Sequence, residues 1–332
     1  MAIAFFDKVY QRAKNNPRRI VLPEGEDARV VAAAFKAAKL QLARIIILGN
    51  KEAILKKAKI AASIIRRVEF VDPRNDVKSN DYINAYWQLR QHKGLSLAQA
   101  KELLLSDYVF YAAMMVRAGM ADGFVAGASH TTSDVARAAL RCFDKTSGTQ
   151  TASGAFLVEV QDKHFGQGGL MLFADCGLMP DPSAAQLVDI ARSSADLWQK
   201  ATGYQPRVAM LSFSSKGSSE APEVAKVKEA TQLLRKACPE LIIDGELQVD
   251  SAIVPEVAKI KVPGSPVEGK ANVLIFPNLD AGNIAYKLVH RLAHARVVGP
   301  LVQGLVKPCS DLSRGCGVQE VLDAIVITAI RA

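Results

Sequence analysis

Apolar and polar segments alternate along the first quarter of the chain in a way that predicts strands separated by helices. Residues 19–23 (RIVLP) and 43–50 (ARIIILGN) are short apolar runs that end in turn residues, as buried strands do. The alanine-rich segment 25–43 between them predicts a helix, because acidic residues stand in its first turn. A second helix and a strand at 68–73 follow. This order predicts a parallel sheet covered by helices.

The same strand-then-helix pattern returns after a stretch rich in glycine, serine and threonine at 144–154. Strands are predicted at 155–160 (AFLVEV) and 272–276 (NVLIF). Between them, RVAMLSFSSKGSS predicts a strand followed by a polar loop at 212–220. This loop resembles a phosphate-binding loop but lacks the spacing of a P-loop. Because 332 residues exceed one ordinary core, the chain is expected to form two domains.

Polar loops stand at the predicted carboxyl ends of strands, where ligands bind in open α/β sheets. The loop GASHTTSD, 127–134, offers Ser129 and Thr131 as hydrogen-bond donors, with His130 between them as a further loop donor. The same residues also fit a helix-capping loop. A second such loop, PNLDAGN, follows the strand at 272–276.

The segment 307–320, KPCSDLSRGCGVQE, concentrates groups suited to phosphate and oxyanion chemistry. It places the Ser313 hydroxyl beside the Arg314 guanidinium, follows them with glycines, and ends in the Glu320 carboxylate. Local spacing alone fits a turn and a helix cap equally well.

Long, ordered stretches of the chain resemble the phosphate acetyl/butyryl transferase family. They include RIVLPEGEDARV, ADGFVAGASHTTSDVARAALR, SGAFLVEV, the run from PGSPVEGK to VHRL, and KPCSDLSRGC. The resemblance implies a two-domain α/β fold, three-layer αβα with mostly parallel sheets, like that of isocitrate and isopropylmalate dehydrogenases. It also implies a discontinuous domain I of residues 1–147 and 297–332, a domain II of residues 148–296, and an active-site cleft between them.

The chemistry that the resemblance implies is reversible transfer of an acetyl group between acetyl phosphate and coenzyme A. The coenzyme A thiolate would attack directly in a ternary complex. Family likeness assigns Glu320 as the base, Ser313 as the oxyanion donor, and Arg314 with Arg137 as the phosphate clamp. The family usually carries an aspartate where this chain has Glu320, preceded by an acid where this chain has Gln319.

Further substrate contacts are implied by the resemblance, at Arg137, Arg90, Ser129, Thr131, Asn283 and Tyr286. The position of Arg90 at the end of a predicted helix, taken alone, favours a different role, in which its charge stabilises the helix C-terminus. Cys309 and Cys316 flank the serine and arginine, and the sequence favours inert thiols there because no histidine neighbours either.

Composition narrows the choice of partners. A net charge of +9 without aromatic-rich RNA motifs favours small anionic substrates, namely acetyl phosphate, coenzyme A and inorganic phosphate, over nucleic acid. Five scattered cysteines predict neither disulfides nor a metal site. No permanently bound cofactor is expected, since coenzyme A or acetyl-CoA is a substrate. The chain has no membrane-length apolar run or signal-peptide pattern, which predicts a cytoplasmic protein. The resemblance implies a homodimer.

Three alternatives stay open. A phosphate butyryltransferase would share the mechanism and differ in pocket volume. A non-catalytic acetyl-CoA sensor would share the domain. A nicotinamide-dependent dehydrogenase would share the fold, but no GxGxxG follows the first strand.

Overall fold

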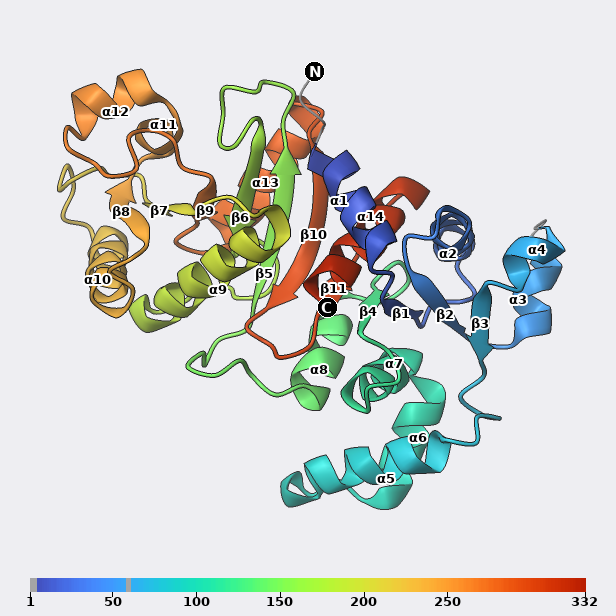
Figure 1. Ribbon diagram of the computed structural model, residues 1–332. Helices are drawn as coiled ribbons and strands as arrows, with labels where there is room; N and C mark the ends of the chain where they lie inside the picture. The colour runs from blue at the N-terminus through green and yellow to red at the C-terminus, as the bar shows by residue number, and fades with distance from the viewer. Residues whose placement is uncertain (1–4, 58–60) are drawn as a thin grey trace. The chain divides into compact units, whose positions relative to one another are not determined.

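The computed structural model describes residues 5–57 and 61–332 (Figure 1). The chain divides into two compact units, which we call unit 1 (Met1–Asp144 with Leu305–Ala332) and unit 2 (Lys145–Gly304). The second junction lies after residue 304, beyond the expected position at 296/297. The reason is that β10 (Arg296–Gln303) pairs with β5 (Ser153–Glu159) along most of its length and so belongs to unit 2. The expected location of the active site between the domains stays a prediction.

Unit 1 is built on a parallel sheet. Its strand order is β3 (Val68–Val71), β2 (Arg44–Leu48), β1 (Arg19–Leu22), β4 (Gly123–Ala126) and β11 (Cys309–Asp311). Every pairing among them is parallel. The apolar runs therefore form the buried parallel strands that their pattern predicts. The short strand β11 lies inside the segment 307–320, for which no strand was predicted.

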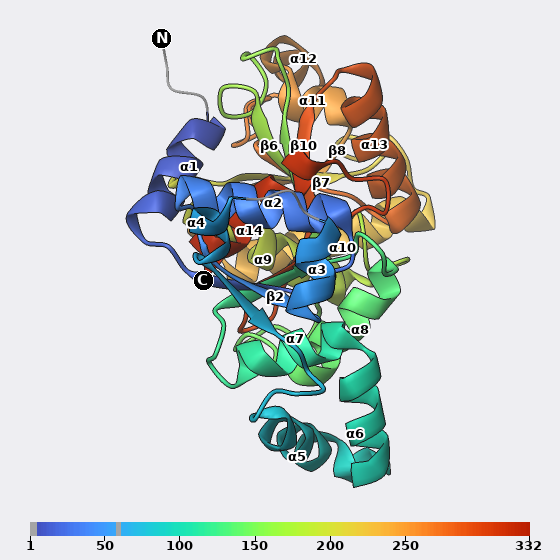
Figure 2. The ribbon, with the colours of Figure 1, turned by 90° about the vertical axis from the view of Figure 1, so that its right-hand side faces the viewer.

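Helices cover both faces of the unit 1 sheet (Figures 1 and 2). One face carries α2 (Ala28–Leu40) and α14 (Val318–Arg331), with α1 (Phe5–Asn15) packed on α14. The other carries α7 (Tyr108–Arg117) and α8 (Thr132–Cys142), and α7 is followed outward by α5 (Ser79–Arg90) and α6 (Leu97–Ser106). Where one helix was predicted over 51–63, α3 (Lys51–Lys57) and α4 (Ala62–Ile65) form, and 58–60 lie outside the described residues.

Unit 2 has a mixed sheet with the strand order β10, β5, β6 (Leu170–Ala174), β9 (Val273–Ile275), β7 (Arg207–Leu211) and β8 (Ile242–Leu247). The pairs β10–β5 and β5–β6 are antiparallel, and the remaining pairs are parallel. One face carries α9 (Ala184–Thr202) and α10 (Pro222–Ala237). The other carries α11 (Val249–Ile253), α12 (Pro255–Lys261) and α13 (Leu279–Leu292).

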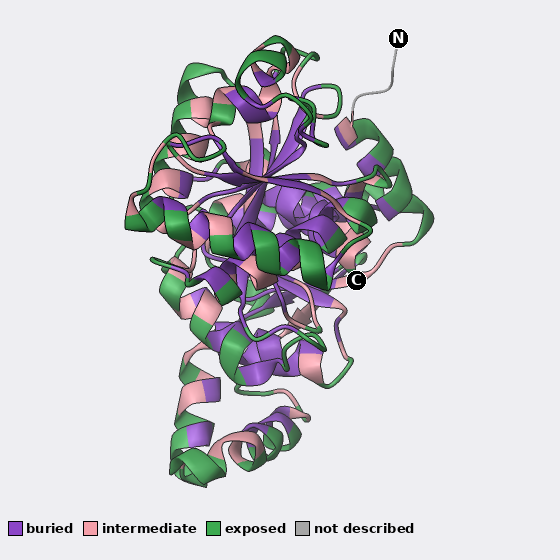
Figure 3. Cartoon of the chain, turned by 90° about the vertical axis from the view of Figure 1, so that its left-hand side faces the viewer, coloured by how far each residue is buried: buried purple, intermediate pink, exposed green. Residues whose placement is uncertain are grey.

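Burial follows this layering, since most strands are buried along most of their length and the helices are exposed mainly on their outer faces (Figure 3). The edge strand β3 is the exception, with only Val68 buried. In α14 the residues from Val321 to Ala329 are all buried, so this helix forms part of the core of unit 1. None of the helices within 5–57 and 61–332 combines the length and apolarity needed to cross a bilayer.

Candidate active site

Three loops leave the same edge of the unit 1 sheet. Parallel pairing aligns Val21 of β1 with Phe124 of β4, and Phe124 with Cys309 of β11. The loops that follow these strands, 23–27, 127–131 and 312–317, therefore emerge together at the carboxyl ends. We call this group of loops the three-loop edge. It is the position at which α/β sheets bind ligands.

The second and third loops approach each other closely at Gly127. Its φ is +111°, a conformation that favours glycine. A Cβ at this position would lie 2.1 Å from Asp311 Oδ1 and 2.6 Å from the Leu312 nitrogen. Only a residue without a side chain lets loop 127–131 pack against the start of loop 312–317.

The buried carboxylate of Glu24 holds loop 127–131 in place. It accepts the backbone N–H groups of Ala128 (2.9 Å), Ser129 (2.8 Å) and His130 (3.1 Å). It also accepts the Ser129 hydroxyl at 2.9 Å and lies 2.8 Å from His130 Nδ1. Burial alone would raise the pKa of Glu24, but these hydrogen bonds, led by that of His130, bring it below its usual value. The hydrogen bond to Glu24 raises the pKa of His130.

Arg29 joins all three loops. Its Nη1 donates to the carbonyl oxygens of Arg314 (2.7 Å) and Cys316 (3.0 Å). Its Nη2 donates to the Ala128 carbonyl at 2.8 Å and to the Asp27 carboxylate at 2.7 Å. Asp27 also caps α2. One guanidinium thus fixes the backbone on which Ser313 and Arg314 stand.

Ser313 and Arg314 both have exposed side chains on this fixed backbone. The Ser313 hydroxyl oxygen accepts the Gly315 N–H at 3.3 Å, so its own proton can be donated elsewhere. Within the described part of the chain, the Arg314 guanidinium makes neither a hydrogen bond nor an ion pair. A hydroxyl and an unengaged guanidinium therefore stand side by side at the three-loop edge.

Glu320 lies in the first turn of α14, which begins directly after loop 312–317. Its Oε2 accepts the Gly317 N–H at 2.5 Å, so the carboxylate caps the helix. The neighbouring Gln319 points elsewhere: it donates to the Tyr10 hydroxyl (2.8 Å) and Asp323 (2.9 Å). Gln319 therefore joins α14 to α1, while Glu320 stays half-exposed beside loop 312–317.

At the start of α8, Thr131 acts as the N-cap in a capping box with Asp134. Its hydroxyl donates to Asp134 Oδ2 at 2.7 Å. Arg137 stands one turn into the helix, half-exposed, and pairs with Asp134 Oδ1 at 2.9 Å. Ser129, Thr131 and Arg137 are thus gathered at one side of the three-loop edge.

The remaining predicted binding residues lie elsewhere. Arg90 ends α5, and its charge acts on the Cys142 thiol at the opposite end of α8 from Thr131. Asn283 and Tyr286 belong to α13 of unit 2. Asn283 donates to the Cys176 carbonyl at 3.1 Å, and the Tyr286 ring stacks on Phe156 with centroids 4.0 Å apart.

The cysteines near the site are buried thiols. Burial raises the pKa of Cys309 to about 12 and that of Cys316 to about 11, so both are protonated at neutral pH. Over residues 5–57 and 61–332, no group of three or more histidine, cysteine or acidic side chains is arranged to hold a metal ion.

Sequence reasoning missed Glu24, Arg29 and Asp311. Glu24 and Arg29 stand in a stretch that reads as an ordinary helix start, and no local pattern links them to loops about a hundred or more residues away. Asp311 is 1% exposed, and burial raises its pKa to about 7. The Thr132 side chain and Leu312 N–H lie beside it, but neither makes a hydrogen bond of normal geometry. Asp311 ends the short strand β11, whose sequence CSD has no apolar pattern, so no local signal marked this residue.

Comparison with known proteins relates the chain to one family along nearly its whole length. The chain matches the model of the phosphate acetyl/butaryl transferase family over residues 4–329. It is 44% identical to the phosphate acetyltransferase of Thermoanaerobacterium thermosaccharolyticum over 330 residues, which are 99% of this chain and 100% of that protein.

Solved structures are similar to this chain as well. A phosphotransacetylase from Streptococcus pyogenes superposes with a TM-score of 0.91 at 37% identity, covering 100% of this chain and 99% of that one. A 4-hydroxythreonine-4-phosphate dehydrogenase from Klebsiella pneumoniae shares the fold alone, with a TM-score of 0.51, 12% identity and coverage of 96% and 98%. The predicted dehydrogenase-like α/β fold is confirmed.

Proposed function

This chain belongs to the phosphate acetyl/butaryl transferase family, and from that premise we propose that it transfers an acetyl group between acetyl phosphate and coenzyme A. The reaction is acetyl-CoA + phosphate = CoA + acetyl phosphate. The observation that carries the proposal is 44% identity to a phosphate acetyltransferase over its full length, joined to an exposed hydroxyl and guanidinium on an anchored loop.

The reaction begins with removal of a proton from the coenzyme A thiol, whose pKa lies above neutral pH. Glu320 is the proposed acceptor. Because Oε2 holds the Gly317 N–H, Oε1 is the oxygen that takes the thiol proton. The helix cap then keeps the carboxylate in position while the base acts.

The thiolate sulfur next attacks the carbonyl carbon of acetyl phosphate, and the carbonyl oxygen becomes anionic. The Ser313 hydroxyl donates to that oxygen. When the intermediate collapses, the bond from carbon to the phosphate oxygen breaks and phosphate leaves. Arg314 holds the departing charge, assisted by Arg137, which uses one of its five N–H donors on Asp134 and has the others available.

Substrate binding by Arg90, Ser129, Thr131, Asn283 and Tyr286 is part of the proposal. Coenzyme A enters as a substrate, so no permanently bound cofactor takes part in these steps. The cytoplasmic location stays a prediction from the sequence.

Association as a homodimer is supported by a stripe of exposed apolar residues on α13. Ile284, Leu288 and Leu292 recur at four-residue spacing and are 57%, 52% and 77% exposed. Such a stripe is typical of an association surface.

The test is acetyl-CoA formation from acetyl phosphate and coenzyme A, with butyryl phosphate run in parallel. The proposal predicts a higher kcat/KM for acetyl phosphate. A preference for butyryl phosphate would identify a phosphate butyryltransferase that uses the same mechanism. Absence of turnover with both, from folded protein that binds coenzyme A, would favour the sensor alternative and contradict the proposed activity.

A further inference from the structure

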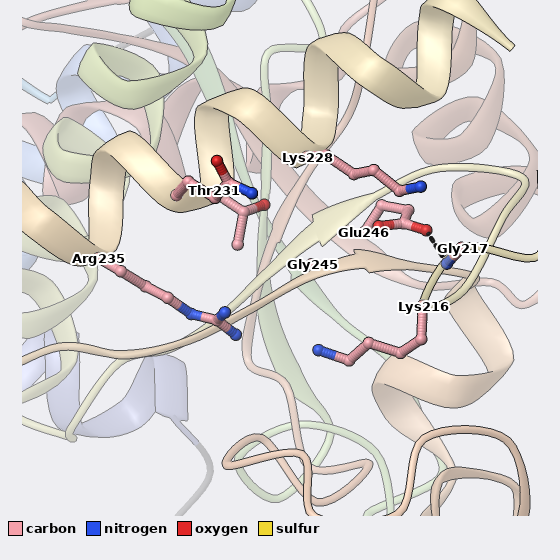
Figure 4. A pocket seen from close by; sticks show the side chains of 8 residues that line it. Lys216, Gly217, Lys228, Thr231, Arg235, Gly245 and Glu246 are labelled. Atoms are coloured by element: carbon pink, nitrogen blue, oxygen red, sulfur yellow. Dashed lines mark hydrogen bonds between the residues drawn. The ribbon is translucent and has the colours of Figure 1, made fainter. Parts of the chain in front are cut away.

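Unit 2 contains a basic cavity whose lining includes none of the residues of the three-loop edge. Its volume is about 330 Å³, at the lower end of the range for small-ligand pockets. It lies where loop 212–220 leaves β7, between that loop, α10 and β8 (Figure 4). Three cations line it, namely Lys216, Lys228 and Arg235, together with Thr231 and Glu246.

The backbone of the loop is shaped like an anion cradle, but it holds a carboxylate of the protein. Lys216 and Gly217 have φ values of +49° and +87°, so two successive residues adopt the left-handed backbone conformation. The Gly217 N–H donates to Glu246 Oε1 at 2.6 Å, and the Ser214 hydroxyl donates to the same oxygen at 3.2 Å. Glu246 is thereby fixed as a hydrogen-bond acceptor in the cavity wall.

Two of the cations are held in place by a buried acid. Lys216 and Arg235 reach towards each other from the loop and from α10 (Figure 4), and both donate to Asp244, whose side chain is fully buried. Burial alone would raise the pKa of Asp244, but the hydrogen bond from Lys216 brings it below its ordinary value. An ammonium has three donors and a guanidinium five, so both groups retain donors for a ligand.

Lys228 is the third cation. Its Nζ lies 3.8 Å from the position that a Cβ on Gly217 would occupy, so the side chain reaches over the loop (Figure 4). The described residues offer it no hydrogen bond or ion pair. By contrast, Lys226 on the same helix pairs with Asp181 at 2.6 Å. The three cations outnumber the two carboxylates, Asp244 and Glu246, so the cavity has an unbalanced positive charge.

We infer that this cavity binds inorganic phosphate. Lys228, Lys216 and Arg235 would donate to the phosphate oxygens, and Glu246 would accept a hydrogen bond from the P–OH group. Inorganic phosphate keeps a P–OH group at neutral pH, whereas sulfate has none and would face Glu246 with an oxygen that cannot donate. A fixed acceptor left unpaired by the wrong ligand gives strong discrimination.

The inference can be tested by measuring the rate at which each lysine is acetylated by an N-hydroxysuccinimide ester, using peptide mass spectrometry. Potassium phosphate and potassium sulfate are compared at equal ionic strength. At phosphate about ten times its Kd, modification of Lys228 should slow roughly tenfold, while sulfate should have little effect. Lys226 and Lys200 should react at unchanged rates. No slowing at Lys228, or equal slowing by sulfate, would overturn the inference.

A matched pair of variants tests whether the protecting phosphate is bound in this cavity. In Lys228→Met, phosphate should no longer protect Lys216, whereas Lys226→Met should retain that protection. Protection of Lys216 that is unchanged in Lys228→Met would also overturn the inference. Because the readout is residue-specific and needs no turnover, it does not depend on the proposed enzyme activity. Inactive protein that shows the protection would contradict only the proposed enzyme activity.

Discussion

Glu320 combines a structural contact with the proposed chemistry, and one substitution separates the two. In Glu320→Gln the amide oxygen can still accept the Gly317 N–H, which the glutamate holds at 2.5 Å, but the side chain can no longer take a proton. We expect kcat for acetyl-CoA formation to fall by roughly 10²- to 10⁴-fold. Thermal unfolding should change little.

Glu320→Asp is the matched variant, since it keeps a carboxylate and shortens its reach by one methylene. Its kcat should exceed that of Glu320→Gln. Steady-state kinetics of both variants beside wild type make the comparison. Wild-type turnover in folded Glu320→Gln would show that another group removes the proton.

Asp311 predicts a pH dependence of stability. Its pKa rises to about 7 in the folded protein because of burial, against about 3.9 in an unfolded chain. Between these values the folded state keeps a proton that the unfolded state has lost, so this contribution to stability declines as pH rises through the window. Asp311→Asn does not titrate and should escape the decline.

The measurement is the free energy of unfolding of wild type and Asp311→Asn at pH 5 and pH 8. From pH 5 to pH 8, wild type should lose roughly 2–3 kcal/mol of unfolding free energy relative to Asp311→Asn, at about 1.4 kcal/mol per pKa unit. The same difference at both pH values would mean that Asp311 is ionised throughout.

At the scale of elements, the start of α2 holds loop 312–317 in place through Arg29. Removing its guanidinium leaves the carbonyls of Arg314, Cys316 and Ala128 without their donor. Arg29→Gln should lower kcat by about 10²-fold through misplacement of Ser313 and Arg314. It should also reduce the free energy of unfolding by roughly 1–3 kcal/mol.

Kinetics and thermal unfolding of Arg29→Gln, Arg29→Lys and Lys36→Met test this. Lysine keeps the charge but cannot reproduce the branched contact of arginine, so Arg29→Lys should have a kcat between those of Arg29→Gln and wild type. Lys36, on the same helix, contacts Gln319 instead, and its loss should leave kcat near wild type. An Arg29→Gln enzyme with normal kcat would contradict the positioning role.

The strands and loops differ in how well the sequence predicts them. Long apolar runs such as that of β2 read correctly as buried parallel strands, because burial on both faces leaves an unmistakable pattern. Polar loops do follow the carboxyl ends of β4 and β11, and ligand binding by these loops stays a prediction. The three-residue strand β11, with the sequence CSD, has no such pattern and takes its structure from pairing with β4.

Other site features depend on contacts between distant residues. Arg29 and Arg314 are 285 positions apart, and nothing near either in sequence indicates that they meet. The same holds for Glu24, whose partners in loop 127–131 lie more than a hundred residues away. Such contacts depend on the parallel register of the strands, which the sequence alone does not specify residue by residue.

At the scale of the whole molecule, the exposed stripe on α13 predicts a dimer that one charge disrupts. Light scattering coupled to size exclusion should give wild type twice the chain mass. Leu288→Asp should give the mass of a single chain, because a carboxylate would be desolvated in an apolar interface. Leu233→Asp, on an exposed position of α10, is the matched control and should remain a dimer. Monomeric wild type, or dimeric Leu288→Asp, would contradict this surface.

The proposed acetyl transfer depends most directly on the hydroxyl of Ser313. The decisive measurement is kcat for acetyl-CoA formation by Ser313→Ala, with circular dichroism to confirm the fold. Loss of the oxyanion donor should lower kcat by roughly 10²- to 10³-fold, with a smaller effect on KM. Turnover near that of wild type would show that loop 312–317 does not carry the acetyl-transfer chemistry.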